Sequence, residues 1–322
     1  MEKVLELIKD ELKIVEEKFK SRFASQVPFI NMVAEHLVLG GGKRFRPSIL
    51  LLSAKLCGYS GEDHISLAEI IEFIHTATLL HDDVIDNAEI RRGSASANTL
   101  WGNKASILVG DFLYTRAFSM AVGIGNPKIL RTLVDSTSIL VEGETAELVK
   151  TADLSITEEE NLELIINKTA ILISAATRMG AILGKAPPET EEALAHYGLK
   201  VGIAFQLMDD YLDYTGKNET LGKDTGRDLK EGKITLPLIH TLKQCTSEEK
   251  REIQEIVLSE ELPPDGLQRV IYLINKYNGV EYTLAKAQQH IREGKESLRN
   301  LPPSPEKEAL FELADYVVNR RV

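Results

Sequence analysis

The chain has 322 residues, of which 27% are charged, and its formal net charge is −11 at pH 7. This acidic balance argues against a nucleic-acid partner, which needs a basic surface. Cys57 and Cys245 are the only cysteines, so a disulfide scaffold is excluded and a cytoplasmic location is favoured. No apolar stretch predicts a membrane-spanning segment, and the acidic, amphipathic N-terminus does not resemble a signal peptide.

Apolar residues recur at helical spacing along almost the whole chain, and no strand-length alternation stands out. Thr157 with Glu160 predicts a capping box at the start of one helix. Pro263–Pro264 and Pro302–Pro303 interrupt shorter helices in the tail, after a loop rich in Gly and Lys at 215–235. In chain order, the main helices are expected over residues 4–19, 28–38, 48–57, 65–86, 105–122, 129–149, 157–183 and 189–214. Because no long polar linker separates them, we expect an all-α fold with one large domain spanning residues 1–322.

Two aspartate clusters of the form D-D-x-x-D are the most informative feature, and each follows an apolar run. On a helix the first and last aspartates of each cluster share one face, and the extra carboxylate at i+1 widens the oxygen surface. The carboxylates on such a face repel one another unless cations bind to them. The helix dipole strengthens this repulsion near a helix C-terminus, which is where we place the first cluster. One cluster alone also fits a solvated acidic turn; two copies beside predicted core do not. The clusters predict a site for Mg²⁺, with Mn²⁺ as the alternative, through Asp82, Asp83, Asp86, Asp209, Asp210 and Asp213.

Basic and polar residues accompany the acids. Gly40–Gly42 precede Lys43 and Arg46; this is not a P-loop, because Arg44 replaces the required Ser or Thr, but a glycine turn with cations can bind phosphate. Each of the other candidates, taken alone, also fits a surface or core position without function. These candidates are His75, Arg91, Arg92, Lys168, Thr169, Gln206, Lys223 and Lys233.

Together these motifs resemble the trans-prenyl diphosphate synthases, and most of all the octaprenyl diphosphate synthases. The matching stretches are G-G-K-R-F-R-P (41–47), H-T-A-T-L-L-H-D-D-V-I-D (75–86), R-R-G (91–93), G-N-K-A-S-I-L-V-G-D-F-L-Y-T-R-A (102–117), K-T (168–169), F-Q-L-M-D-D-Y-L-D (205–213) and G-K-D-T-G-R-D-L-K-E-G-K-I-T-L-P (222–237). The resemblance implies a helical bundle around a deep central cavity, with both clusters facing each other at its mouth. It also implies about three Mg²⁺ ions per active site and a homodimer.

The resemblance assigns roles by position. Asp82, Asp86 and Asp209 would be the principal metal ligands and, with Lys168 and Lys223, the catalytic residues, while Asp83, Asp210 and Asp213 would support the metals. The allylic diphosphate would be held by Arg91, Lys168, Thr169, Gln206, Lys223 and Lys233. Isopentenyl diphosphate would be held by Lys43, Arg46, His75 and Arg92.

The implied reaction joins isopentenyl diphosphate head-to-tail (1′-4) to an allylic diphosphate. Ala77 and Thr78, five and four residues before the first cluster, are small, and in this family bulk there shortens the product. We therefore expect a medium or long all-trans polyprenyl diphosphate for a quinone side chain. The same small residues also fit close helix packing without any role in product length.

Other functions stay open at this point. A short-chain farnesyl or geranylgeranyl diphosphate synthase would share all the motifs. A terpene cyclase also uses D-D-x-x-D, but usually with a different second metal motif. A non-catalytic subunit of a synthase would tend to lose the aspartates, and all six are present.

Overall fold

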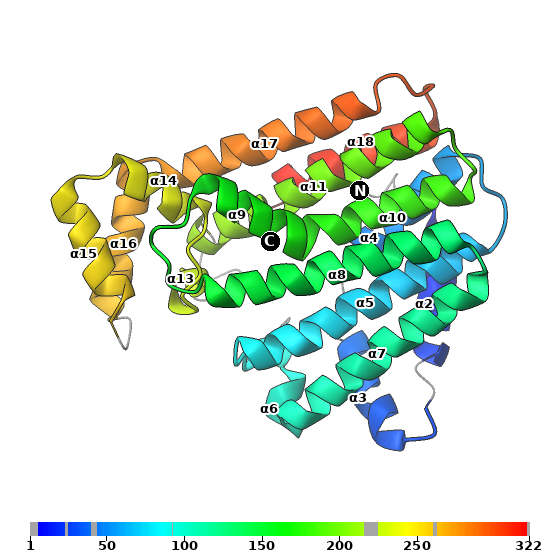
Figure 1. The fold of residues 1–322 in the computed structure, drawn as a ribbon, viewed down its shortest axis with the longest axis horizontal. Coiled ribbons are helices and arrows are strands. Elements are labelled where there is room, and N and C mark those ends of the chain that lie inside the picture. Colours follow the sequence, from blue (N-terminus) through cyan, green and yellow to red (C-terminus); the bar gives the residue numbers. More distant parts are fainter. Residues whose placement is uncertain are drawn as a thin grey trace. The chain divides into compact units, whose positions relative to one another are not determined.

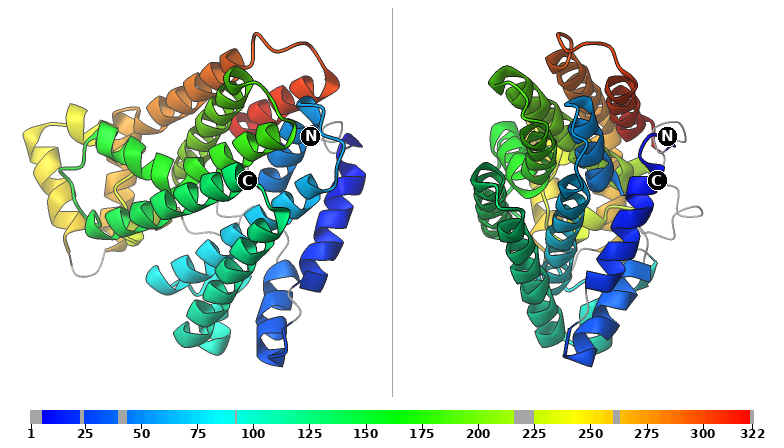
Figure 2. Two further views of the ribbon diagram at one scale, coloured as in Figure 1. Left: turned by 45° about the vertical axis from the view of Figure 1, so that its right-hand side comes forward. Right: turned by 90° about the vertical axis from the view of Figure 1, so that its right-hand side faces the viewer.

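The computed structural model describes residues 6–22, 25–39, 44–91, 93–215, 225–259 and 263–320. Helices account for 80% of it, and the only strands in these ranges are the two-residue β1 (Ile90–Arg91) and β2 (Ser94–Ala95), paired antiparallel. The predicted all-α fold is confirmed (Figures 1 and 2). Lys43, Arg92 and Lys223 lie outside the described residues.

Spatial contacts divide the chain into two compact units, which we call unit 1 and unit 2. Unit 1 comprises Met1–Val134, Ala175–Ala195 and Leu301–Leu313, and unit 2 comprises Asp135–Ser174, His196–Asn300 and Ala314–Val322. Four of the boundaries fall inside continuous helices, namely α8 (Pro127–Val149), α10 (Ile171–Leu183), α11 (Pro188–Thr215) and α18 (Pro305–Asn319). A single domain over residues 1–322 stays a prediction.

Unit 1 is built around α5 (Asp63–Ile85), which packs along α7 (Asn103–Ile124) and α4 (Phe45–Leu56) (Figure 1). Its middle is apolar on every side, as in Ile70, Ile71 and Ile74, and all three side chains are fully buried. A helix that is apolar all round has to be covered on every face. The remaining helices that lie wholly in unit 1 are α2 (Lys9–Arg22), α3 (Pro28–Leu39) and α6 (Ala97–Trp101).

Unit 2 has its own apolar core, in which Leu238, Val270, Leu273 and Ile274 are fully buried. These residues come from α14 (Leu236–Gln244) and α16 (Pro264–Lys276), and α16 packs beside α15 (Ser247–Val257), as Figure 1 shows. The other elements that lie wholly in unit 2 are α9 (Glu158–Ile165), the π-helix η1 (Ile166–Ala170), α13 (Arg227–Lys230) and α17 (Gly279–Ser297).

One described helix, α7, is long and apolar enough by length and composition to cross a membrane. By itself this is weak evidence, because core helices of globular proteins pass the same test. Only 28% of its most apolar window is buried in the structure. The expectation of no membrane-spanning segment stays a prediction, and the exposed apolar surface of α7 needs an explanation.

The helix expected over residues 157–183 consists of three parts. Its start is as predicted: the Thr157 hydroxyl accepts a hydrogen bond from the Glu160 amide at 3.1 Å, and the Glu160 carboxylate accepts one from the Thr157 amide at 2.8 Å. Over Ile166–Ala170 the helix widens into a π turn before it continues as α10. Such turns insert one extra residue, often at functional sites, and this one contains Lys168 and Thr169.

Two glycines let neighbouring helices approach the π turn. A Cβ on Gly143 of α8 would lie 2.7 Å from the Cβ of Asn167, and a Cβ on Gly202 of α11 would lie 2.6 Å from the Cα of Ala170. A real Cβ atom does not approach another atom this closely, so a side chain at either position would force the helix or the π turn to shift. The π turn is therefore held between two helices that carry no side chain at the points of contact.

We expect Gly202→Ala to destabilise the fold by about 1–3 kcal/mol, because overpacking forces the π turn away from α11. Since Thr169 lies in that turn, the activity that the sequence resemblance implies should fall more than stability alone explains. Chemical denaturation and steady-state kinetics measure the two effects, with Gly123→Ala as the control, because a Cβ there meets no atom within 4 Å. Unchanged stability and activity in Gly202→Ala would contradict this account of the packing.

A buried glutamate in unit 1 makes stability depend on pH. Glu69 of α5 is 0% exposed, and its Oε2 lies 3.2 Å from Nη1 of Arg22 on α2. Burial raises the pKa of Glu69 to about 7, against the lowering influence of Arg22 and Lys18. Because the folded state holds this proton more tightly than the unfolded state, its contribution to stability is complete below pH 4.5 and is lost as pH rises through about 7.

We expect Glu69→Gln to match the wild type near pH 5 and to be more stable by about 2 kcal/mol at pH 8, because glutamine mimics the protonated acid. Urea denaturation at both pH values measures this difference. Glu62→Gln, at an exposed position just before α5, is the control. Parallel pH profiles for wild type and Glu69→Gln would contradict the prediction.

Candidate active site

The first aspartate cluster lies at the C-terminal end of α5, as predicted. The helix ends at Ile85, and the Asp86 amide donates to the Asp82 carbonyl oxygen at 2.8 Å. Asp82 and Asp86 are partly exposed, whereas Asp83 is fully buried. The two aspartates that share a helix face are therefore accessible to a cation.

Asp83 is engaged by Arg91. The Arg91 Nε and Nη2 atoms donate to Oδ1 of Asp83 at 2.7 and 2.5 Å, and Asn98 donates to the Asp83 carbonyl oxygen at 3.0 Å. Arg91 reaches back over the end of α5 because β1 and β2 form a hairpin, with Gly93 at φ +79° in its turn. The sequence predicted no strand here, since two-residue strands carry no periodic signal.

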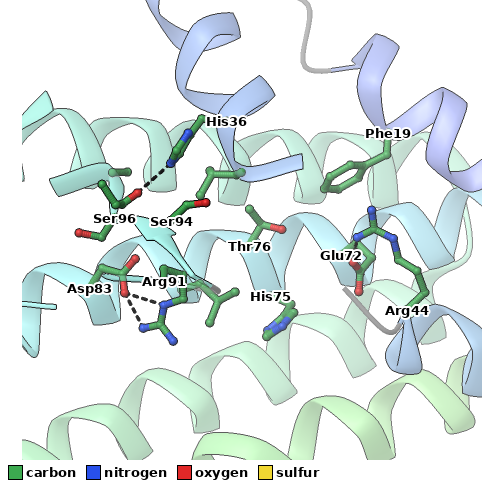
Figure 3. Close-up of a pocket in the computed structure, with 14 residues that line it drawn as sticks. Phe19, His36, Arg44, Glu72, His75, Thr76, Asp83, Arg91, Ser94 and Ser96 are labelled. Atoms are coloured by element: carbon green, nitrogen blue, oxygen red, sulfur yellow. Dashed lines mark hydrogen bonds and ion pairs between the residues drawn. The ribbon is translucent and has the colours of Figure 1, made fainter. Parts of the chain in front are cut away.

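A cavity in unit 1 contains three of the predicted site residues. His75, Asp83 and Arg91 line it together with His36, Arg44 and Glu72, and Figure 3 shows Arg91 directed at Asp83. Just beside it, Nη1 of Arg46 lies 3.2 Å from Nε2 of His75. The structure thus brings together two of the residues that the resemblance assigns to isopentenyl diphosphate.

The second cluster lies at the C-terminal end of α11 in unit 2. The Asp209 side chain is 47% exposed, while Asp210 is buried. Asp213 accepts hydrogen bonds from the backbone amides of Arg227 and Asp228 at 3.1 and 3.2 Å. Both Asp213 oxygens therefore hold the start of α13, which fits a supporting role better than direct metal ligation.

Three predicted residues form a hydrogen-bonded chain. The Thr169 hydroxyl donates to Oε1 of Gln206 at 2.9 Å, and Nε2 of Gln206 donates to Oδ1 of Asp210 at 3.0 Å. Burial raises the pKa of Asp210 to about 7; the Gln206 hydrogen bond lowers it, and the charges of Asp209 and Glu147 raise it further. The π turn is thereby connected to the second cluster.

The second cluster offers carboxylate oxygens to a divalent cation, although the described residues contain no preformed group of three metal-ligating side chains. Oδ2 of Asp210 is buried and has no hydrogen-bond partner, and a buried carboxylate oxygen normally has one. The surrounding donors are carboxylate oxygens, which suit a hard cation such as Mg²⁺. The carboxylate of Asp209 is more exposed than that of Asp210 and is accessible to such an ion.

The two predicted cations of unit 2 that the structure describes already have acidic partners. Nζ of Lys168 contacts Glu144 at 2.9 Å and also Glu147, and Nζ of Lys233 lies 2.8 Å from Oε2 of Glu231. A substrate phosphate would therefore have to replace carboxylates at these lysines.

A second cavity brings five predicted residues together: Lys168, Thr169, Gln206, Asp210 and Lys233. Glu147 and Asp228 also line it, and sequence reasoning missed both. Burial, with the charges of Asp213 and Asp210, raises the pKa of Asp228 well above its ordinary value. The signals were available: Asp228 lies in the G-K-D-T-G-R-D-L stretch, and Glu144 and Glu147 are one helical turn apart.

Comparisons with known proteins identify the family of the chain. The family model of polyprenyl synthetase matches residues 27–274. The octaprenyl diphosphate synthase of Escherichia coli (strain K12) is 42% identical over 320 residues, which cover 99% of this chain and 99% of that protein.

Two solved structures are similar throughout. A decaprenyl diphosphate synthase from Rhodobacter capsulatus has a TM-score of 0.95 and 38% identity, covering 100% of this chain and 99% of that one. A polyprenyl synthase from Caulobacter crescentus CB15, complexed with calcium and isoprenyl diphosphate, has a TM-score of 0.96 and 39% identity, covering 100% and 98%. With the family model and a full-length relative in agreement, the chain belongs to the polyprenyl synthetase family.

Proposed function

We propose that the protein is a Mg²⁺-dependent trans-polyprenyl diphosphate synthase. It condenses isopentenyl diphosphate with an allylic diphosphate and releases a medium or long all-trans polyprenyl diphosphate, the precursor of a quinone side chain. The observation that carries this proposal is the cavity of unit 2, where Lys168, Thr169, Gln206, Asp210 and Lys233 surround one space. The octaprenyl and decaprenyl products named for similar proteins favour a long product over a short one.

The residues of unit 2 would bind the allylic diphosphate. Lys168 and Lys233 would bind its oxygens, and Thr169 and Gln206 would fix its orientation; outside the described residues, Lys223 is proposed for the same role. Bound Mg²⁺, about three ions per site, would supply Lewis-acid stabilisation of the leaving diphosphate. The principal ligands would be Asp82, Asp86 and Asp209, supported by the buried aspartates of each cluster.

The residues of unit 1 would bind isopentenyl diphosphate. Arg46 and His75, in contact at 3.2 Å, would hold its diphosphate together with Lys43 and Arg92. The allylic substrate ionises to a carbocation, and the double bond of isopentenyl diphosphate attacks it. A proton is then lost to the departing diphosphate. Water has to be excluded, because it would trap the cation.

The ion pairs of the basic site residues affect how a diphosphate substrate would bind. Arg91 is paired with Asp83, Lys168 with two glutamates and Lys233 with Glu231. Each cation must exchange a carboxylate for a phosphate oxygen when substrate arrives. Diphosphate and divalent cations are therefore expected to bind together rather than separately.

The exposed apolar surface of α7 supports a homodimer. Leu108 and Val122 are 68% and 62% exposed, and with exposed Thr115 they recur every seven residues along one face. A repeat of seven is the spacing at which helices pair along a seam. A cytoplasmic location is also proposed, since Cys57 and Cys245 are both free thiols.

A product assay tests the function. The purified chain is incubated with labelled isopentenyl diphosphate, farnesyl diphosphate and Mg²⁺, and the dephosphorylated products are sized. A ladder that ends at a long prenyl alcohol is expected, and EDTA should abolish it. Incorporation that stops at a short product would favour the short-chain alternative, and no incorporation with any allylic starter would overturn the proposal. Light scattering on the same sample measures whether the protein is a dimer.

A further inference from the structure

The C-terminal end of α18 is held against the helix that carries the second cluster. Nη2 of Arg320 donates to the Phe205 carbonyl oxygen at 2.7 Å and to Oδ1 of Asp209 at 2.8 Å. The guanidinium carbon also lies 4.1 Å from the centre of the Phe205 ring. Arg320 thus contacts two residues of α11 that lie one turn apart, and one of them is a proposed metal ligand.

The guanidinium position does not depend on Asp209 alone. Two of its three contacts are made with Phe205, and its side chain is 5% exposed. The α18 end is fixed as well, because the Arg320 amide donates to the Tyr316 carbonyl oxygen at 3.0 Å and Asp315 is paired with Lys295 of α17. A group held in this way keeps its place when Asp209 binds a cation.

The Asp209 carboxylate is more exposed than the guanidinium that contacts it. The Asp209 side chain is 47% exposed, and an exposed aspartate samples several rotamers at little cost. Oδ1 accepts from the fixed arginine, so the carboxylate is restricted to orientations that keep this bond. A carboxylate has about four lone-pair positions, so the hydrogen bond from Arg320 does not by itself exclude a metal ion.

The charge of Arg320 also matters for the cluster. Asp209 and Asp210 are adjacent acidic residues, and crowded carboxylates repel each other. A guanidinium at 2.8 Å from Asp209 offsets part of this repulsion. The arginine therefore lets the aspartates remain close together before a metal ion binds.

We propose that Arg320 is a positioning residue for the metal site, which orients the Asp209 carboxylate for Mg²⁺. This inference rests on the proposed function and adds a residue that acts through Asp209. Groups that hydrogen-bond to metal ligands typically contribute 10- to 100-fold to metal affinity or activity. Arg320 is 111 residues from Asp209 in the sequence, so no local motif pointed to it.

The test compares Mg²⁺ binding by wild type, Arg320→Met and Arg320→Lys. Methionine keeps the length and the packing on Phe205 but removes the donors, and lysine restores the charge without the planar fork. Calorimetric titration of Mg²⁺ in the presence of inorganic pyrophosphate gives the affinity without turnover. We expect about tenfold weaker Mg²⁺ binding in Arg320→Met and partial recovery in Arg320→Lys.

Arg269→Met is the matched control. Arg269 also lies in unit 2 and forms two hydrogen bonds to one glutamate, Glu252, both at 2.8 Å. The Arg269→Met variant should keep the wild-type Mg²⁺ affinity. Circular dichroism should show that all variants are folded. Wild-type affinity in Arg320→Met, or tighter binding, would overturn the role of Arg320 while leaving the proposed function standing. Absence of both Mg²⁺–pyrophosphate binding and prenyl transfer in the wild type would instead overturn the proposed function itself.

Discussion

Asp82→Ala and Asp209→Ala should each lower the rate of prenyl transfer by about a thousandfold. Asp82→Ala should leave the fold intact, whereas Asp209→Ala also removes the ion-pair partner of the buried Arg320 and should cost some stability. A bound divalent cation supplies several kcal/mol of stabilisation to the developing charge, and about 1.4 kcal/mol corresponds to a tenfold change in rate. Both side chains are at least partly exposed, so their removal leaves no buried cavity. Removing a negative charge near a helix C-terminus even relieves an unfavourable interaction with the helix dipole.

The measurement is kcat with saturating substrates over a range of Mg²⁺ concentrations, together with thermal unfolding in EDTA. Asp10→Ala, at an exposed position of α2, is the control and should behave as wild type. Asp83→Ala makes a useful contrast: it removes the partner of Arg91 and should cost about 2 kcal/mol of stability, because breaking a largely buried ion pair leaves a charge unpaired. Near-normal turnover in Asp82→Ala or Asp209→Ala would remove the metal-site proposal.

The aspartates show why part of the site could be predicted. Helical periodicity places residues four apart on one face, and the structure leaves Asp82 and Asp86 partly exposed at the end of α5. The same periodicity turns the i+1 residue away, and Asp83 is buried against Arg91. Local sequence was sufficient here because the geometry of a helix is fixed by spacing alone.

Other parts of the site depend on contacts between distant segments. The ion pairs of Lys168 with Glu144 and Glu147 join α8 to the π turn, and the pair of Arg320 with Asp209 joins the tail to α11. The π turn itself has the composition of an ordinary helix and was predicted as one. Gly143 and Gly202 approach this turn closely, and only the packed structure reveals these contacts.

Ala77→Phe should shorten the polyprenyl product if the growing chain passes this position. Ala77 lies on α5 five residues before Asp82 and is fully buried, and Thr78 beside it donates to the His75 carbonyl oxygen at 2.8 Å. A phenyl ring in the path of the chain would occupy space that otherwise receives further prenyl units. The product ladder should then end several units earlier, at little cost in stability.

If Ala77 only serves close helix packing, the opposite results are expected for both product length and stability. In a dense core, an added ring displaces its neighbours at a cost of about 1–3 kcal/mol, and the product length stays the same. Neither Ala77 nor Thr78 lines either of the two cavities described above, so product length and stability must both be measured. Ala68→Phe is the matched control, because Ala68 is also fully buried on α5 and lies farther from the aspartates: it should lower stability and leave the product unchanged. If Ala77→Phe behaves in the same way as Ala68→Phe, the prenyl chain does not run beneath the first cluster at this position.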